Sequence, residues 1–116
     1  MKMLSDFKDE KAICVAADVL SVIMEIFSKK ENLKMRGEKN PLKMFSAFMA
    51  NSPAEMKKIF AILSEKDPET YHCDGAEALT NMLILANDSV LVLLFTSQSR
   101  TGDATSSGSV SVNTEE

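Results

Sequence analysis

The stretch that decides the fold is DEKAICVAADVLSVIMEIFSKKENL, residues 9–33. Apolar residues recur along it at the i, i+3, i+4 spacing of an α-helix, as at Ile23 and Phe27. A second apolar row that includes Val19 and Val22 lies beside the first and leaves only a narrow polar stripe. A helix with so narrow a polar face is covered on most sides. We therefore predict one helix over residues 9–33, either at the centre of the domain or in an interface between copies of the chain.

Helix start signals divide the next part of the chain. Asn40 followed by Pro41 predicts an N-cap and the first residue of a second helix. Ser52 and Glu55 predict a third helix that opens with a capping box, in which both side chains accept hydrogen bonds from backbone N–H groups. The apolar residues expected on the buried sides of these two helices are Leu42, Phe45, Phe48, Met49, Met56, Ile59, Phe60 and Leu63.

Two further helices are expected before the chain changes character. A fourth helix runs from about Ala76 to Ala86, and Asn87-Asp88 supplies both its end and the N-cap of the next helix. Residues 90–95 are six consecutive apolar residues, which periodicity alone does not assign to a strand or a helix. We predict a short helix there, because no partner strand is visible elsewhere in the chain.

The last twenty residues have a different composition, with six serines, three threonines and two glycines but no Leu, Ile, Phe or Met. Such a segment does not bury enough apolar surface to offset the entropy cost of ordering it. We predict an all-α protein: a small bundle of four to five helices in one domain over residues 1–97, followed by a disordered, Ser/Thr-rich acidic tail over residues 98–116.

The composition is that of a globular chain, with 116 residues, 45% hydrophobic and 26% charged. No apolar run approaches the roughly 20 residues that span a bilayer, and Met1–Glu10 does not resemble a secretory signal. We expect a soluble, cytoplasmic protein that does not associate with membranes. Its charge is uneven, because residues 1–66 carry 12 Lys and Arg against 9 Asp and Glu, whereas residues 67–116 carry 1 against 8.

Residue types that support catalysis or metal binding are scarce. The chain has one histidine, His72, and no nucleophile elbow, Walker-type glycine loop or CxxC motif. His72, Cys73 and Asp74 are adjacent in a predicted loop, whereas a structural zinc site takes four ligands from separated pairs. We predict no enzymatic activity, no cofactor and no metal. The two cysteines are expected to be unpaired, with Cys14 as a small core residue.

The apolar segment 90–95 is the candidate binding surface. A short helix that is apolar on every side does not bury all of its side chains in a domain of this size. One or two of them are therefore expected to remain exposed to a partner. The candidate partner-binding residues are Val90, Leu91, Leu93, Leu94 and Phe95.

Several segments, in this order along nearly the whole chain, resemble a family of phage tail assembly chaperones. They are Leu4-Ser5-Asp6-Phe7-Lys8-Asp9-Glu10, Asp67-Pro68-Glu69-Thr70-Tyr71-His72, Asn87-Asp88, Leu94-Phe95-Thr96-Ser97-Gln98 and Ser106-Ser107-Gly108-Ser109. The chain departs from that pattern at Ser99 and Arg100, where relatives have Gly and Gln.

The resemblance implies an all-helical, non-enzymatic protein of a long-tailed phage or prophage. Such a chaperone coats the hydrophobic tape measure protein, keeps it soluble, helps recruit tail tube protein and is absent from the mature virion. It would act in the host cytoplasm, and self-association is compatible with this role. Members of the family are often made in two forms through a programmed ribosomal frameshift.

An alternative rests on a basic cluster: Lys29, Lys30, Lys34, Arg36, Lys39 and Lys43. These six charges are diluted by Glu31 and Glu38, and no aromatic residues are interleaved with them. The alternative is a small phage-encoded helical protein that binds nucleic acid or regulates transcription. The acidic balance of the whole chain disfavours it.

Overall fold

The computed structural model describes residues 1–104, with side chains to residue 96. Their elements are the 3-10 helix η1 (Leu4–Asp6) and the α-helices α1 (Asp9–Phe27), α2 (Lys30–Leu33), α3 (Pro41–Asn51), α4 (Pro53–Leu63), α5 (Gly75–Asn87) and α6 (Ser89–Ala104). No strand occurs in this part of the chain. The all-α class is confirmed, with one short helix more than the four to five predicted.

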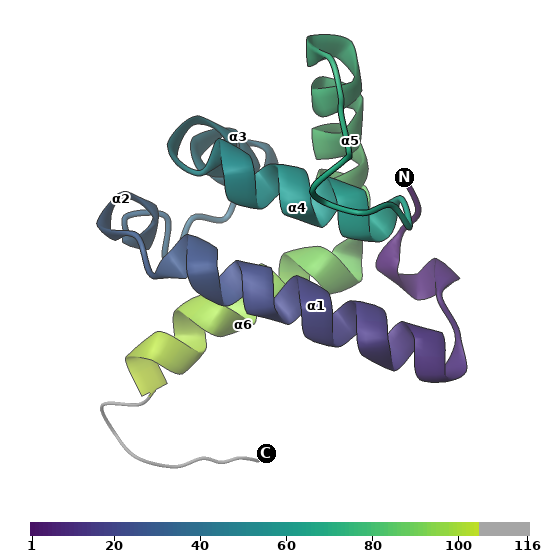
Figure 1. The fold of residues 1–116 in the computed structure, drawn as a ribbon. Helices are drawn as coiled ribbons and strands as arrows, with labels where there is room; N and C mark the ends of the chain where they lie inside the picture. The colour runs from purple at the N-terminus through teal and green to yellow at the C-terminus, as the bar shows by residue number, and fades with distance from the viewer. Residues whose placement is uncertain (105–116) are drawn as a thin grey trace.

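The helices form an irregular bundle (Figure 1). The longest helix, α1, packs most extensively against α4 and is crossed by α6. The other end of the bundle is built by α5, which packs against α3 and then turns into α6. The axes of α5 and of residues 89–96 differ by 80°. As a result, α5 extends away from α1, as Figure 1 shows.

The predicted first helix is interrupted, because α1 ends at Phe27 and the separate turn α2 begins at Lys30. The buried Asn32 side chain explains the break. Its amide nitrogen donates to the Ile26 carbonyl oxygen at 2.7 Å and to the Ser52 hydroxyl at 2.7 Å. The chain must fold back on the end of α1 for these bonds to form, so a continuous helix over residues 9–33 is wrong.

The same contact changes the predicted start of α4. The Ser52 hydroxyl accepts its hydrogen bond from Asn32 and makes none to the backbone of α4. The Glu55 carboxylate instead pairs with Lys29, with Nζ and Oε1 3.2 Å apart. The predicted capping box is therefore wrong, although α4 begins at Pro53 as expected. At α3 the predicted cap is confirmed, since Asn40 accepts from the Leu42 N–H at 3.1 Å.

Aromatic side chains occupy the centre of the core. Phe95 of α6 packs against both Phe45 and Phe48 of α3, with ring centroids 4.9 and 5.3 Å away. Phe27 of α1 reaches the same cluster, 5.4 Å from Phe48 in an edge-to-face arrangement. Such pairs stabilise a core beyond the area they bury. The cluster therefore joins α1, α3 and α6, three elements that are distant in sequence.

One face of α1 is not covered by the rest of the chain, so the helix is not enclosed at the centre of the domain; the alternative, an interface between copies, stays a prediction. Ile13 is 70% exposed, and Met24 and Ala17 on the same face are also exposed. The helices that pack on α1 cover the side of Val19 and Ile23 and leave the opposite side open.

Cys14 is exposed, so its predicted place in the core is wrong, while its expected free thiol is confirmed.

Seven of the eight residues expected on the buried sides of α3 and α4 are buried or half-buried, but Leu42 is exposed. It lies in the first turn of α3 and is 44% exposed. At the other end of the chain, α6 continues to Ala104, beyond the predicted start of the tail at residue 98. Extending an existing helix costs much less than starting one. The rest of the predicted tail, residues 105–116, lies outside the described residues.

Candidate partner-binding surface

The five candidate residues on α6 divide between its two sides. Leu91 and Phe95 are fully buried in the core, so their assignment to a binding surface is wrong. Val90 is 44% exposed and Leu93 is 55% exposed, and Leu94 is half-buried. Residues 91 and 95 are one turn apart and share the inner face, whereas residues 90 and 93 share the outer face. The outer face of α6 thus retains exposed apolar surface.

Asp88 fixes the orientation of this helix. Its Oδ1 accepts from the N–H groups of Val90 and Leu91 at 3.2 and 3.3 Å, which confirms the predicted N-cap. Its Oδ2 accepts from the Leu4 N–H at 2.7 Å, in a buried position. One carboxylate therefore caps α6 and ties it to the N-terminal segment, which sets the face that α6 turns outward.

A second pair of exposed apolar side chains lies on α5. Leu79 is 57% exposed and Leu83 is 48% exposed, and their spacing of four residues places them on one face. Sequence reasoning recognised both as apolar residues of a helix but not as a surface. The segment of α5 contains more apolar residues than one buried face of a helix needs, and this feature of the sequence could have predicted exposed ones. We call Leu79, Leu83, Val90 and Leu93 together the α5–α6 apolar surface.

The stretch of sequence that contains this surface carries charges of one sign. Residues 67–96 contain five acidic residues and no Lys or Arg. Asp88 is buried, whereas Glu69, Asp74 and Glu77 are exposed at or near the start of α5. Asp74 also caps α5 by accepting from the Glu77 N–H at 2.8 Å. The α5–α6 stretch therefore contributes negative charge only, while Lys57 of α4 lies in a pocket that Ala78 of α5 also lines.

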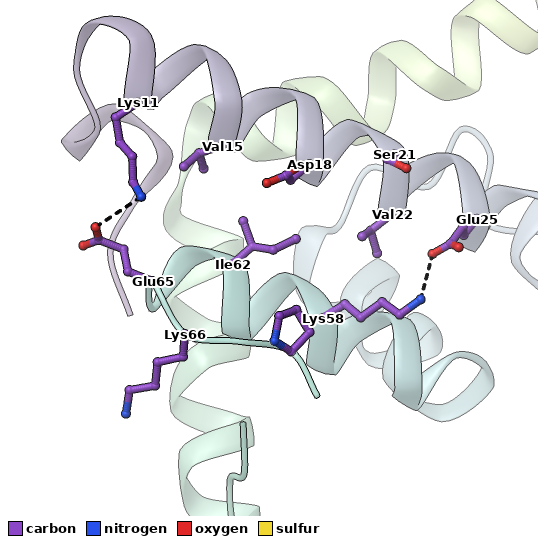
Figure 2. A pocket seen from close by; sticks show the side chains of 11 residues that line it. Lys11, Val15, Asp18, Ser21, Val22, Glu25, Lys58, Ile62, Glu65 and Lys66 are labelled. Carbon is purple, nitrogen blue, oxygen red and sulfur yellow. Dashed lines mark hydrogen bonds and ion pairs between the residues drawn. The ribbon is translucent and has the colours of Figure 1, made fainter. Parts of the chain in front are cut away.

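Away from this surface, an open groove of about 560 Å³ lies between α1 and α4 (Figure 2). Its floor is apolar, with Val15, Val22 and Ile62. Ion pairs cross it at both ends, Lys11 to Glu65 at 3.8 Å and Lys58 to Glu25 at 3.4 Å. Balanced charges that already pair with one another give the groove no clear preference for an anion or a cation.

A smaller apolar pocket of about 190 Å³ lies among α3, α4 and α5. Its wall includes Met49, Met56 and Phe60, together with the half-buried thiol of Cys73. No charged group except the stem and amine of Lys57 lines it. It is a hollow between three helix ends, without the converging polar groups that orient a small ligand.

The predicted basic cluster is partly neutralised by the fold. Lys29 pairs with Glu55, and Lys43 lies 3.9 Å from Glu38. Burial by itself raises the pKa of Glu55, but the hydrogen bond from its own backbone N–H and the Lys29 ammonium outweigh burial and lower it. At the exposed edge of α4, the hydrogen bond from Lys2 lowers the pKa of Glu65. Each of these lysines is paired with a carboxylate of the same chain.

Within residues 1–104 no group of three or more His, Cys, Asp or Glu side chains is placed to hold a metal ion. No single described helix is long and apolar enough to cross a membrane. Helix α5 and residues 89–96 meet the length and hydropathy requirement only when taken together, as a pair bent by 80°.

The fold and this surface define a small all-helical protein with exposed apolar side chains on α5 and α6. The chain matches no protein-family model, no curated protein and no solved structure.

Proposed function

We propose that this protein is a binding protein that covers apolar helical surface of another chain. On its resemblance to phage tail assembly chaperones, we further propose that the client is the tape measure protein of a long-tailed phage or prophage. In that role it would keep the client soluble and help recruit tail tube protein during tail assembly.

The observation that carries the proposal is the outer face of α6. Phe95 anchors this helix in the aromatic core, while Leu93, two residues earlier, is 55% exposed. Folding of this chain alone leaves Leu93 and Val90 in water. Burying each such side chain against a partner would contribute about 1.5 to 3 kcal/mol. A few side chains per copy give weak contacts that strengthen when several copies bind along one client.

Weak individual contacts suit a chaperone that must later leave its client. A long helical client offers an apolar stripe, and helix-against-helix contact covers such a stripe directly. Nothing in this arrangement requires a cofactor, a metal or a catalytic group.

Co-expression with the tape measure protein tests the proposal. The wild-type chain should keep the client in the soluble fraction and co-purify with it. Leu93→Glu should fold normally, because the side chain is outside the core, and should lose the client. The matched control is Leu42→Glu, which makes the same change at an exposed leucine of α3.

Retention of the client by Leu93→Glu, or equal loss with Leu42→Glu, would show that the contact lies elsewhere. The nucleic-acid alternative makes a separate prediction through the basic cluster. If the alternative holds, the protein should bind DNA or RNA, and its affinity should fall steeply as the salt concentration rises and counterions are released. If the protein instead keeps the client bound at high salt and in the absence of nucleic acid, the result supports the chaperone.

A further inference from the structure

We propose that the apolar pocket among α3, α4 and α5 is a socket for one aromatic side chain of the client, a phenylalanine with an acidic residue next to it. This inference rests on the proposed function and adds a second contact to the one made by the outer face of α6. It follows from the depth, the volume and the lining of the pocket.

The pocket extends from the surface of the molecule to its core. Pro53 at its edge is exposed, and Met49 and Cys73 are half-buried. Met56 and Phe60, which also line it, are 1% and 3% exposed and belong to the hydrophobic core. A group that enters the pocket therefore contacts side chains that are otherwise shielded from water.

The volume of the pocket, about 190 Å³, limits the size of its occupant. An engineered apolar cavity of about 150 Å³ binds a benzene molecule, whereas pockets for drug-sized ligands begin at about 300 Å³. The pocket therefore accommodates a single ring. It offers no converging polar groups to orient a free ligand, but a side chain needs none, because the chain that carries it fixes its direction.

The lining favours an aromatic ring over an aliphatic group. Three of the seven lining residues carry sulfur, namely Met49, Met56 and Cys73, and a fourth is Phe60. Methionine sulfur makes favourable contacts with aromatic rings, and the flexible methionine side chain adapts its shape to an occupant. Two rings attract each other in edge-to-face or offset arrangements. Phenylalanine is the side chain that suits both kinds of contact and has no polar atom to satisfy.

Lys57 determines the charge that fits next to the ring, because it is the one charged residue among those that line the pocket. It is half-buried and takes part in none of the ion pairs formed by the described side chains. Asp74 and Glu77 lie near the start of α5 but do not line the pocket. A lysine stem covers apolar surface while its ammonium stays in water. A carboxylate beside the ring of the client would meet this ammonium at the mouth of the pocket.

Alkylation of Cys73 in the full-length chain tests the proposal, because this thiol lines the pocket and is shielded when the pocket is filled. Cys14 of α1 is exposed and provides an internal control. The probes are three short peptides that differ only at two neighbouring positions, which are Phe-Glu, Ala-Glu or Phe-Gln. Iodoacetamide reacts with both thiols, and mass spectrometry of the digested protein gives the rate at each.

We expect the Phe-Glu peptide, at about ten times its dissociation constant, to slow alkylation of Cys73 about tenfold, since only the free pocket reacts. The rate at Cys14 should not change, and the Ala-Glu peptide should protect neither thiol. The Phe-Gln peptide should bind about two- to fourfold more weakly than Phe-Glu, the range of one exposed ion pair. No protection by Phe-Glu at millimolar concentration, or equal protection by Ala-Glu, would overturn the proposal. Equal binding of Phe-Gln would overturn the acidic neighbour.

Variants assign the contact to the pocket, with binding of the labelled Phe-Glu peptide followed by fluorescence anisotropy. Ala78→Leu fills the pocket from α5 and should abolish binding, whereas Ala76→Leu, at an exposed position of the same helix, should not. Lys57→Met removes the charge and should make the affinities for Phe-Glu and Phe-Gln equal. Lys66→Met, outside the pocket, is its control and should preserve the difference. Binding that survives Ala78→Leu would contradict the proposal, and the alkylation experiment does not depend on how these variants fold.

The outcome is separable from the proposed function. If the chain solubilises the tape measure protein on co-expression but the Phe-Glu peptide does not protect Cys73, only the socket inference fails. If the peptide protects Cys73 but the client is not retained, the proposed function fails instead. Protection by free 3-phenylpropionate at a lower concentration than by the peptide would overturn the assignment of the pocket to a protein side chain.

Discussion

Asp88 connects three backbone N–H groups from two distant parts of the chain. Two of them belong to the first turn of α6 and the third to Leu4, and the carboxylate itself is 1% exposed. A buried N–H that loses its acceptor costs more than an ordinary hydrogen bond contributes. This one side chain therefore determines both where α6 begins and how the N-terminal segment is held.

We expect Asp88→Ala to lower the free energy of unfolding by about 2 to 4 kcal/mol, the sum of a lost N-cap and an unpaired buried N–H. Chemical denaturation followed by circular dichroism measures this change. Asn87→Ala, at the exposed neighbouring position, should cost less than about 0.5 kcal/mol. Equal effects of the two variants would show that the carboxylate has no special role.

Asn32 plays a comparable part between α1 and α4. Its side chain is fully buried, donates to Ile26 and Ser52, and accepts from Asn51 at 3.4 Å. Asn32→Leu keeps a similar volume but removes these three side-chain hydrogen bonds. We expect the free energy of unfolding to fall by about 2 to 4 kcal/mol, measured by chemical denaturation. A neutral result would mean that Asn32 does not hold the end of α1.

Glu55 makes stability depend on pH on the acidic side. Its pKa in the folded protein is lowered, since its backbone hydrogen bond and Lys29 outweigh burial. A carboxyl of this kind contributes stability above its unfolded pKa, and the contribution is lost as pH falls through the folded pKa. Glu55→Gln should therefore lose less stability than the wild type between about pH 5 and 3. If the free energy of unfolding of the two proteins changed equally with pH across that range, the assignment to Glu55 would be contradicted.

At the scale of the element, α6 has a buried and an exposed face that its sequence does not separate. Six consecutive apolar residues have no visible periodicity, so residue types alone gave no reason to divide Leu91 and Phe95 from Val90 and Leu93. The division comes from the N-cap at Asp88 and from the position of α3, both of which are tertiary features. The helix was predictable, but its inner and outer faces were not.

This division gives a direct comparison on one helix. Phe95→Ala removes a ring from the aromatic cluster and should cost about 3 to 5 kcal/mol. Leu93→Ala removes an exposed side chain and should change stability by no more than about 0.5 kcal/mol. Thermal or chemical unfolding of both variants measures the difference. Similar losses at the two positions would mean that α6 does not lie as described.

The interruption after α1 shows the same limit of sequence reasoning. Residues 9–33 have helical spacing throughout, and nothing in the local pattern marks Phe27 as the end. The break depends on a hydrogen bond from Asn32 to Ser52, which lies just before α4 and twenty residues later in the chain. In contrast, Asn40, Pro41 and Pro53 predicted the starts of α3 and α4 correctly, because their effect is confined to the first helical turn.

At the scale of the whole molecule, basic and acidic residues are concentrated in different parts of the chain. The first 66 residues hold nearly all the Lys and Arg, several of them in ion pairs, and residues 67–96 hold acidic residues without Lys or Arg together with the exposed Leu79, Leu83 and Leu93. The charge asymmetry was readable from the sequence. Its coincidence with exposed apolar side chains required the structure, because exposure depends on which faces the bundle covers.

Site-specific photo-crosslinking tests the central claim, that the α5–α6 apolar surface holds a helix of another chain. A photoreactive phenylalanine analogue replaces Leu93 in one variant and Leu42 in a matched one, and each is co-expressed with the tape measure protein. We predict a crosslinked adduct between the two proteins from position 93 and little or none from position 42. An adduct that forms equally from position 42, or none from position 93 while the client stays soluble, would contradict the account.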